Sequence, residues 1–225
     1  MNDSFGQLFV VATPIGNLSD MTVRGLETLR SVGLIACEDT RVTKKLLRHF
    51  EIDVPTVSLH QHSDDRKIQS IINRLCEGGD VAYVTDAGTP GVSDPGNRLV
   101  SACVSSGIRV VPIPGVSAVL AIVSVCGADL QRFLFLSYPP HKKGRETFFS
   151  RVCESEVPII YFDSVHRVVK NLVLLSQKKP EAQIVLGREL TKMHEEIVRG
   201  RVDEVIAYFS EHPDRLKGEF VVVVL

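Results

Sequence analysis

Residues 79–98, GDVAYVTDAGTPGVSDPGNR, constrain the fold of this chain more than any other stretch. Residues 81–84 form a short apolar run of strand-forming residues, and a loop rich in glycine and proline follows. Asp94 is a good helix N-cap and Pro95 suits the first helical position, so a helix is expected to begin there. The stretch therefore predicts a strand, a glycine-rich loop and a helix, a unit of an open α/β sheet that binds ligands at this edge. A tight strand-to-helix turn without a ligand is the plain alternative.

Short apolar runs alternate with helical patterns along the first half of the chain. The expected strands lie at about residues 8–12, 34–37, 55–59, 81–84 and 108–111. This alternation predicts a mainly parallel five-stranded sheet with helices on both faces. The second half is less regular and predicts a smaller α/β domain with a mixed sheet. We place the boundary between domains 1–115 and 116–225, because the two prolines in residues 112–114 resist both helix and central strand.

The composition narrows the class of protein. The 225 residues carry a net charge of −1, so a surface for nucleic acid must be a local basic patch. The chain lacks an apolar run of about 18 residues and a signal peptide. Its five cysteines are widely spaced, which fits a reducing cytoplasm and predicts no zinc site. His60 and His62 alternate at a strand end, but zinc usually needs a third ligand. We expect a cytoplasmic protein without a metal.

Several catalytic motifs are absent, namely the P-loop and the G-x-S-x-G elbow. Residues 86–91 superficially resemble a dinucleotide fingerprint, but Pro90 removes a backbone donor and blocks a helix there. What remains is a set of polar, glycine-rich or proline-rich loops at strand ends: TPIGN, EDTR, TDAGTPG, PIPGVSA and GRELTK. Such loops are expected to meet at a sheet edge and at a domain cleft. Their few charges suit an adenosine moiety better than a polyphosphate.

These loops carry a resemblance to a known family. The chain resembles the ribosomal RNA small subunit methyltransferase I family, within the tetrapyrrole methylase, or class III methyltransferase, superfamily. The resemblance runs in order through VATPIGNLSDMT (11–22), ACEDTR (36–41), SLHQHS (58–63), TDAGTPGVSDPG (85–96), VVPIPGVSA (110–118), HRV (166–168), GRELTK (187–192) and KGEFV (217–221). The combination of TPIGN, DAGTP and PGVSA is highly specific, whereas each motif alone is weak.

The resemblance implies a fold, a reaction and partners. It implies two α/β domains with the cofactor in the interdomain cleft, and a homodimer. The implied reaction is S-adenosylmethionine-dependent 2′-O-methylation of a cytidine in the decoding region of 16S ribosomal RNA, within the 30S subunit. By position, the implied cofactor contacts are Pro14, Asp86, Ala87, Gly88, Thr89, Val92, Ser117, Ala118, Phe162, Glu189 and Leu190. Two segments depart from the family pattern: residues 137–140 are SYPP where a GFLP-type loop is usual, and residues 162–166 are FDSVH where YESPH is common.

Removal of a ribose hydroxyl proton calls for a base. We expect this base among Glu38, Asp39 and Glu189, which stand at strand ends beside the expected cofactor loops. The structural alternative is that Asp39 or Thr40 caps the next helix, which is expected over residues 42–50.

Basic residues at the strand ends, in the helix after EDTR and in the loop 141–145 are candidates for RNA contact. The candidates are Arg41, Lys44, Lys45, Lys142, Lys143, Arg145 and Lys192. A solvated basic loop is the plain alternative for the patch at 141–145. Two other functions stay open at this point: a tetrapyrrole or other small-molecule methyltransferase on the same fold, and a non-catalytic nucleotide-binding module.

Overall fold

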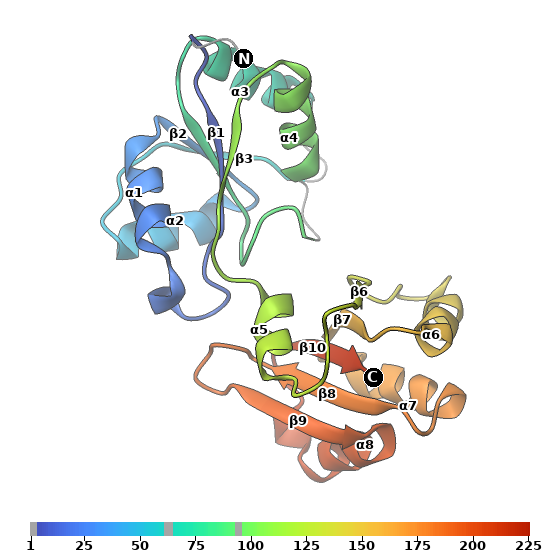
Figure 1. The fold of residues 1–225 in the computed structure, drawn as a ribbon. Coiled ribbons are helices and arrows are strands. Elements are labelled where there is room, and N and C mark those ends of the chain that lie inside the picture. Colours follow the sequence, from blue (N-terminus) through green and yellow to red (C-terminus); the bar gives the residue numbers. More distant parts are fainter. Residues whose placement is uncertain (1–3, 61–64, 93–95) are drawn as a thin grey trace. The chain divides into compact units, whose positions relative to one another are not determined.

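The computed structural model describes residues 4–60, 65–92 and 96–225, and Figure 1 shows its fold. The chain divides into two compact units, Met1–Ser117 and Ala118–Leu225. This division lies close to the domain boundary that we place from the sequence. Within the described residues, each unit contains one five-stranded sheet, and each unit is described by itself.

Strands and helices alternate through most of the chain (Figure 1). In the first unit they are β1 (Leu8–Val11), η1 (Leu18–Asp20), α1 (Val23–Ser31), β2 (Leu34–Cys37), α2 (Thr40–His49), β3 (Thr56–Ser58), α3 (Asp65–Cys76), β4 (Val81–Val84), α4 (Gly96–Ser105) and β5 (Val110–Ile113). In the second unit they are α5 (Ala118–Val125), β6 (Leu134–Phe135), α6 (Arg145–Glu154), β7 (Ile159–Ser164), α7 (Val168–Lys178), β8 (Gln183–Arg188), β9 (Glu196–Arg201), α8 (Val202–Glu211), η2 (Pro213–Arg215) and β10 (Glu219–Val224).

The sheet of the first unit is parallel, with the strand order β3-β2-β4-β1-β5. Strand β4 lies at its centre and is buried along its whole length, as expected for a strand covered on both faces. Helices α1 and α2 pack on one face, and α3 and α4 pack on the other (Figure 1). In α3, Ile68, Ile71, Ile72 and Leu75 recur at helical spacing and form the buried side. The predicted parallel sheet is confirmed.

Strand β5 lies further along the chain than expected and includes Pro112. It is an edge strand, and the carbonyls of Arg109 and Ile113 accept hydrogen bonds from the β1 side. Because backbone groups alternate along a strand, the nitrogen of Pro112 faces the open edge, where no ladder donor is needed. The expectation that residues 112–114 avoid a central strand is thus compatible with β5, but the expected end of this strand at residue 111 is two residues too early.

Helix α2 also begins earlier than expected, at Thr40. The side chain of Asp39 caps it by accepting the backbone N–H of Arg41 at 2.8 Å. The structural role that the sequence offers for Asp39 is thus present. The expected caps of α4, Asp94 and Pro95, lie outside the described residues.

The sheet of the second unit is mixed, with the strand order β6-β7-β10-β8-β9. Strand β6 pairs with β7 in parallel, and the other neighbours are antiparallel. The last strand of the chain, β10, lies at the centre and is buried over residues 220–224, which explains the apolar run at the end of the sequence. Helices α6, α7 and α8 pack on one face of this sheet (Figure 1). The predicted mixed sheet is confirmed.

Within the described residues, no helix has the length and apolar character that crossing a bilayer requires. The same residues hold no group of three or more His, Cys, Asp or Glu side chains placed to bind a metal, and the five cysteines are free. His62, considered from the sequence as one of a metal-binding pair, lies outside the described part of the chain.

Candidate functional site

The loops after β1 and β4 are joined at the carboxyl edge of the first sheet. Thr13 and Gly88 exchange two backbone hydrogen bonds, each of 3.0 Å. Gly88 has a φ of 81°, a left-handed conformation that glycine adopts without strain. A Cβ at Gly88 would lie 3.2 Å from Cγ2 of Ile15, so the two loops also approach each other closely. They therefore form one structure at this edge.

The loop after β5 is tied to the same structure through Thr89. The Thr89 hydroxyl donates to the carbonyl oxygen of Val116 at 2.8 Å. Gly115 allows the loop to pass close to the end of β1, since a Cβ there would lie 2.9 Å from the Cβ of Ala12. Three of the loops that the resemblance assigns to the cofactor are thus connected by contacts within the first unit.

A mostly apolar hollow of about 300 Å³ opens beside these loops, a volume at the lower end of the range for ligand pockets. It is lined by Thr13, Pro14, Ile15, Gly16, Leu18, Val42, Thr43, Lys45, Leu46, Thr85, Asp86 and Ala87. The expected cofactor contacts Pro14, Asp86 and Ala87 therefore share one hollow. Lys45, an expected RNA contact, stands in its wall.

Acidic residues gather at the ends of β2 and β4. The Asp39 carboxylate pairs with the Arg41 guanidinium at 2.6 Å, and the backbone N–H of Asp39 donates to Oδ1 of Asp86 at 3.0 Å. The hydrogen bonds from Arg41 lower the pKa of Asp39 to about 2. Burial raises the pKa of Asp86, and it outweighs the hydrogen bond from the backbone N–H of Asp39, which lowers that pKa. Asp39 is therefore a weak base that caps α2 and holds Arg41, and Asp86 is the better proton acceptor.

A polar hollow of about 380 Å³ lies over these groups. It is lined by Glu38, Asp39, Thr40, Arg41, Ser58, His60 and Asp86. Ser58 and His60, at and just beyond the end of β3, are residues that the sequence reasoning did not assign to this site. The available signal is their place in the SLHQHS motif, which the resemblance includes.

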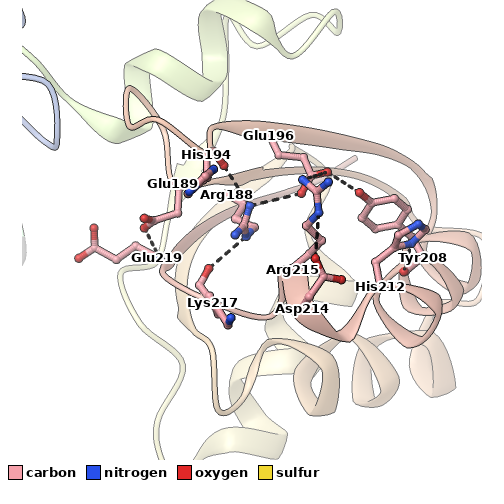
Figure 2. Close-up of polar contacts among 10 residues, drawn as sticks. All are labelled: Arg188, Glu189, His194, Glu196, Tyr208, His212, Asp214, Arg215, Lys217 and Glu219. Carbon is pink, nitrogen blue, oxygen red and sulfur yellow. Dashed lines mark hydrogen bonds and ion pairs between the residues drawn. The ribbon is translucent and has the colours of Figure 1, made fainter.

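In the second unit, Lys192 lies between two carboxylates at the ends of β8 and β10. Its Nζ is 2.7 Å from Oε1 of Glu189 and 2.8 Å from Oε2 of Glu219. The Glu189 carboxylate also accepts the backbone N–H of Glu219 at 3.0 Å (Figure 2). Burial opposes ionisation of Glu189, but these hydrogen bonds outweigh burial and lower its pKa. Glu189 is therefore a weak base and a firmly held hydrogen-bond acceptor.

The backbone around this cluster adopts unusual conformations. Glu189 and Thr191 have φ values of 49° and 67°, in the left-handed region that residues with a side chain rarely adopt. Gly218 has a φ of 86°, and a Cβ there would overlap the carboxylate of Glu189. The sequence reasoning assigned neither Gly218 nor Glu219 a role, although both stand in the KGEFV motif.

Phe162, an expected cofactor contact on β7, belongs to a small aromatic cluster. Its ring centroid lies 5.0 Å from that of Phe135 and 5.4 Å from that of Tyr138. Its backbone N–H donates to the carbonyl of Ser137 at 2.9 Å. Ser137 has a φ of 55°, a left-handed conformation that glycine adopts without strain and that residues with a side chain rarely adopt.

The other expected cofactor contacts differ in exposure. Leu190 is buried and Val92 is exposed. Ser117 and Ala118 are half-buried, where the chain passes from the first unit to the second. Their role toward a cofactor stays a prediction.

The expected RNA contacts occur in both units. Lys44 and Lys45 are exposed on α2, and Lys142 and Lys143 are exposed on the loop before α6. Arg145 is half-buried, and its guanidinium donates to a backbone carbonyl of α7 at 3.2 Å. The four lysines are thus accessible to a polyanion, whereas Arg145 also has a structural contact.

Comparison with known proteins places this geometry in context. A sequence profile for the family described as Tetrapyrrole (Corrin/Porphyrin) Methylases matches residues 7–206. Three similar proteins are each called Ribosomal RNA small subunit methyltransferase I. The one from Synechocystis sp. is 43% identical over 97% of this chain and 78% of its own length. The protein from Escherichia coli O157:H7 is 42% identical over 99% of this chain and 79% of its own length. The protein from Hydrogenobaculum sp. is 40% identical over 97% of this chain and 95% of its own length.

Solved structures share the fold at low sequence identity. Diphthine synthase superposes with a TM-score of 0.76 and 17% identity over 98% of this chain and 90% of its own. Cobalt precorrin-4 methyltransferase, a cobalamin biosynthetic enzyme, superposes with a TM-score of 0.71 and 17% identity over 96% of this chain and 94% of its own. At this identity the likeness concerns the architecture alone.

Proposed function

The chain belongs to the tetrapyrrole methylase family and, within it, to the ribosomal RNA small subunit methyltransferase I family, and from this premise we propose that it methylates ribosomal RNA with S-adenosylmethionine as the donor. The finer proposal is 2′-O-methylation of a cytidine in the decoding region of 16S ribosomal RNA, by a homodimer acting on the 30S subunit. The observation that carries the proposal is the joining of three motif-bearing loops by Thr13, Gly88 and Thr89 at one sheet edge.

The residues at this edge fit an adenosine-bearing sulfonium donor. Gly88 and Gly115 leave no room for a Cβ without displacement of a neighbour, so the loops that form this edge pack closely against one another. The adjoining hollow is mostly apolar, as a purine and a thioether chain require. The Asp86 carboxylate supplies a negative charge beside it, which a positive sulfonium group needs.

We propose that the residues assigned by the resemblance hold the donor. They are Pro14, Asp86, Ala87, Gly88, Thr89, Val92, Ser117, Ala118, Phe162, Glu189 and Leu190. When bound, S-adenosylmethionine supplies an electrophilic methyl group, so the chain's own task is to align the ribose hydroxyl and to take up its proton. The low pKa of Asp39 and the hydrogen bonds of Glu189 make both poor acceptors. Glu38 and Asp86 remain as acceptors.

Contacts to RNA phosphates are proposed for the exposed lysines. They are Lys44, Lys45, Lys142 and Lys143, with Arg41, Arg145 and Lys192 as further candidates. Lys192 is held by two carboxylates, which raise its pKa against the opposing effect of burial and keep it an ammonium. A fixed cation of this kind suits a phosphate or a developing alkoxide.

The test is a methyl-transfer assay with labelled donor. Its substrates are 30S subunits that lack the modification, protein-free 16S ribosomal RNA and a tetrapyrrole such as uroporphyrinogen. We expect label in RNA, recovered after nuclease digestion as 2′-O-methylcytidine. Label on a base would contradict the ribose assignment, and label in the tetrapyrrole alone would favour the small-molecule alternative. Binding of the donor without transfer to any substrate would favour a non-catalytic module.

A further inference from the structure

Arg188, the last residue of β8, is a buried cation with three partners in the part of the chain that the structure describes. Its side chain is about 5% exposed. Nε donates to the carbonyl oxygen of Lys217 at 3.1 Å, and Nη1 donates to the carbonyl oxygen of His194 at 3.0 Å (Figure 2). Nη1 also lies 3.6 Å from Oε2 of Glu196. A buried charge is tolerated only when it is paired and hydrogen-bonded, and Arg188 meets both conditions.

Glu196 is itself oriented from its far side. Oε1 accepts the hydroxyl of Tyr208 and lies 3.6 Å from Nη1 of Arg215 (Figure 2). The Tyr208 ring stacks on His212 with centroids 4.5 Å apart. Strand β9, helix α8 and η2 therefore fix the carboxylate that faces Arg188. The carboxylate that pairs with Arg188 is thus itself held by partners on two other elements.

The two carbonyls belong to two different loops. His194 lies in the loop 189–195 between β8 and β9, and Lys217 lies in the loop 216–218 before β10. The first loop contains the left-handed residues Glu189 and Thr191, and the second contains Gly218, whose lack of a side chain makes room for Glu189. Strained backbone of this kind persists only where surrounding contacts determine it. Arg188 supplies such a contact to both loops at once.

We propose that Arg188 is a positioning residue, whose guanidinium holds the loops 189–195 and 216–218 together in the strained shape that binds the methyl donor. This proposal rests on the proposed function, in which Glu189 and Leu190 of the loop 189–195 contact the donor. Arg188 does not itself act on the donor. It acts through His194 and Lys217, whose carbonyls it binds.

The loop contains hydrogen-bonded amides that report on its shape. The N–H of Thr191 donates to the Glu195 carboxylate at 2.6 Å, and the N–H groups of Lys192 and Glu195 donate to carbonyls within the loop at 3.0 Å. Arg188→Lys keeps the charge opposite Glu196 but cannot reproduce the two-carbonyl fork. We expect hydrogen exchange of these amides to become about tenfold faster in Arg188→Lys, with exchange of the β10 core unchanged.

The matched control is Arg201→Lys, an exposed arginine on β9 that pairs with an exposed aspartate at 3.2 Å. It is expected to leave exchange in the loop unchanged. Tyr208→Phe is the second variant, because it removes the hydrogen bond to Glu196 at a distance from the loop. It is expected to accelerate the same amides by a smaller factor, and it serves if Arg188→Lys fails to fold. Loop exchange that matches the wild-type protein in folded variants would overturn the proposal.

Donor binding provides the functional part of the test. Calorimetric titration with S-adenosylmethionine, without RNA, is expected to give a Kd about tenfold weaker in Arg188→Lys and unchanged in Arg201→Lys. Faster exchange with an unchanged Kd would show that Arg188 is only structural and would overturn its role in binding. A wild-type protein that binds no donor at all would instead overturn the proposed function, and the exchange data would still decide whether Arg188 holds the loops.

Discussion

Asp39 illustrates how hydrogen-bonding partners decide what a single carboxylate can do. Asparagine at this position keeps a good N-cap for α2 and removes the charge that faces Arg41. We expect Asp39→Asn to lower turnover by less than about tenfold, whereas loss of a general base costs about 100-fold or more. The free energy of unfolding should change little, because the Arg41 side chain is 87% exposed and water screens its charge.

Initial rates with saturating donor and urea unfolding measure the two quantities. Asp86→Asn is the companion variant, and we expect it to lower kcat/KM by about 100-fold or more, because Asp86 has the raised pKa and lines both hollows. A larger loss of turnover in a folded Asp39→Asn protein than in Asp86→Asn would restore Asp39 as the base.

Gly218 gives a second prediction for a single residue. Its φ of 86° strains any other residue, and a Cβ would also displace Glu189. Gly127, in the same unit, has a φ of 78° and no described heavy atom within 4 Å of such a Cβ. Both alanine variants therefore bear the backbone strain of about 1–2 kcal/mol. We expect Gly218→Ala to lower the free energy of unfolding by about 1 kcal/mol more than Gly127→Ala. Equal losses by urea unfolding would mean that Glu189 moves aside freely.

Among the elements, β7 and α7 are joined by a buried carboxylate. Asp163 is 2% exposed and accepts the side-chain N–H of Asn171 at 2.7 Å. Burial raises the pKa of Asp163 above 3.8, against the effect of its hydrogen bonds. The folded protein therefore binds this proton more tightly than the unfolded chain does. The ionised carboxylate destabilises the fold at neutral pH, and this penalty fades as the pH falls through the raised pKa toward the unfolded value.

Asp163→Asn removes the ionisable group. Its one amide oxygen can accept the backbone N–H of Ser164, and its amide N–H can donate to the oxygen of Asn171 once the Asn171 amide turns over. We expect the free energy of unfolding at about pH 7 to rise by on the order of 1 kcal/mol, and the gain to shrink toward about pH 4. Urea unfolding at several pH values measures it. Asp203→Asn is the control, because Asp203 is exposed and hydrogen bonds from Arg201 lower its pKa against burial. It should give no gain at neutral pH, and a gain for Asp163→Asn that is independent of pH would contradict the argument.

Sequence reasoning works well for elements whose burial sets their pattern. The fully buried β4 appears where a short apolar run predicts a strand. Sequence reasoning works less well where the end of an element depends on a neighbouring strand or on a capping side chain. Pro112 belongs to a strand because β5 lies at an edge, and α2 begins at Thr40 because Asp39 caps it. The order of strands and the direction of a side chain are not visible in a hydrophobic pattern, so these two boundaries are misplaced.

For the molecule as a whole, one part of the candidate site follows from the predicted fold and another part does not. The loops that contain Thr13 and Gly88 follow parallel neighbouring strands, so their meeting at one edge follows from the predicted sheet. Glu189 meets Gly218 only because β8 pairs antiparallel with β10, a neighbour that the second half of the sequence does not specify. The contact of Arg188 with Lys217 is hidden for the same reason, whereas its contact with His194 lies within the hairpin that β8 forms with β9.

Charge is also a property of the whole molecule, and a chain of net charge −1 must bind RNA through a local patch. Lys142 and Lys143 are exposed on one loop, and each is expected to contact a phosphate. Each contact with single-stranded RNA contributes about 0.7 to the slope of log affinity against log salt. The double variant Lys142→Ala/Lys143→Ala should therefore flatten this slope by about 1.4, measured by fluorescence anisotropy with a decoding-region fragment.

The control for that experiment changes net charge by the same amount elsewhere in the second unit. This control is the double variant Lys178→Ala/Lys179→Ala at the end of α7, where Lys178 pairs with Glu146 at 3.2 Å and Lys179 is the C-cap. If total charge governed binding, both double variants would flatten the slope equally. If phosphates bind the loop before α6, only Lys142→Ala/Lys143→Ala flattens it. A slope that this variant leaves unchanged would remove the loop from the RNA interface and leave Lys44 and Lys45 on α2 as the next lysines to test.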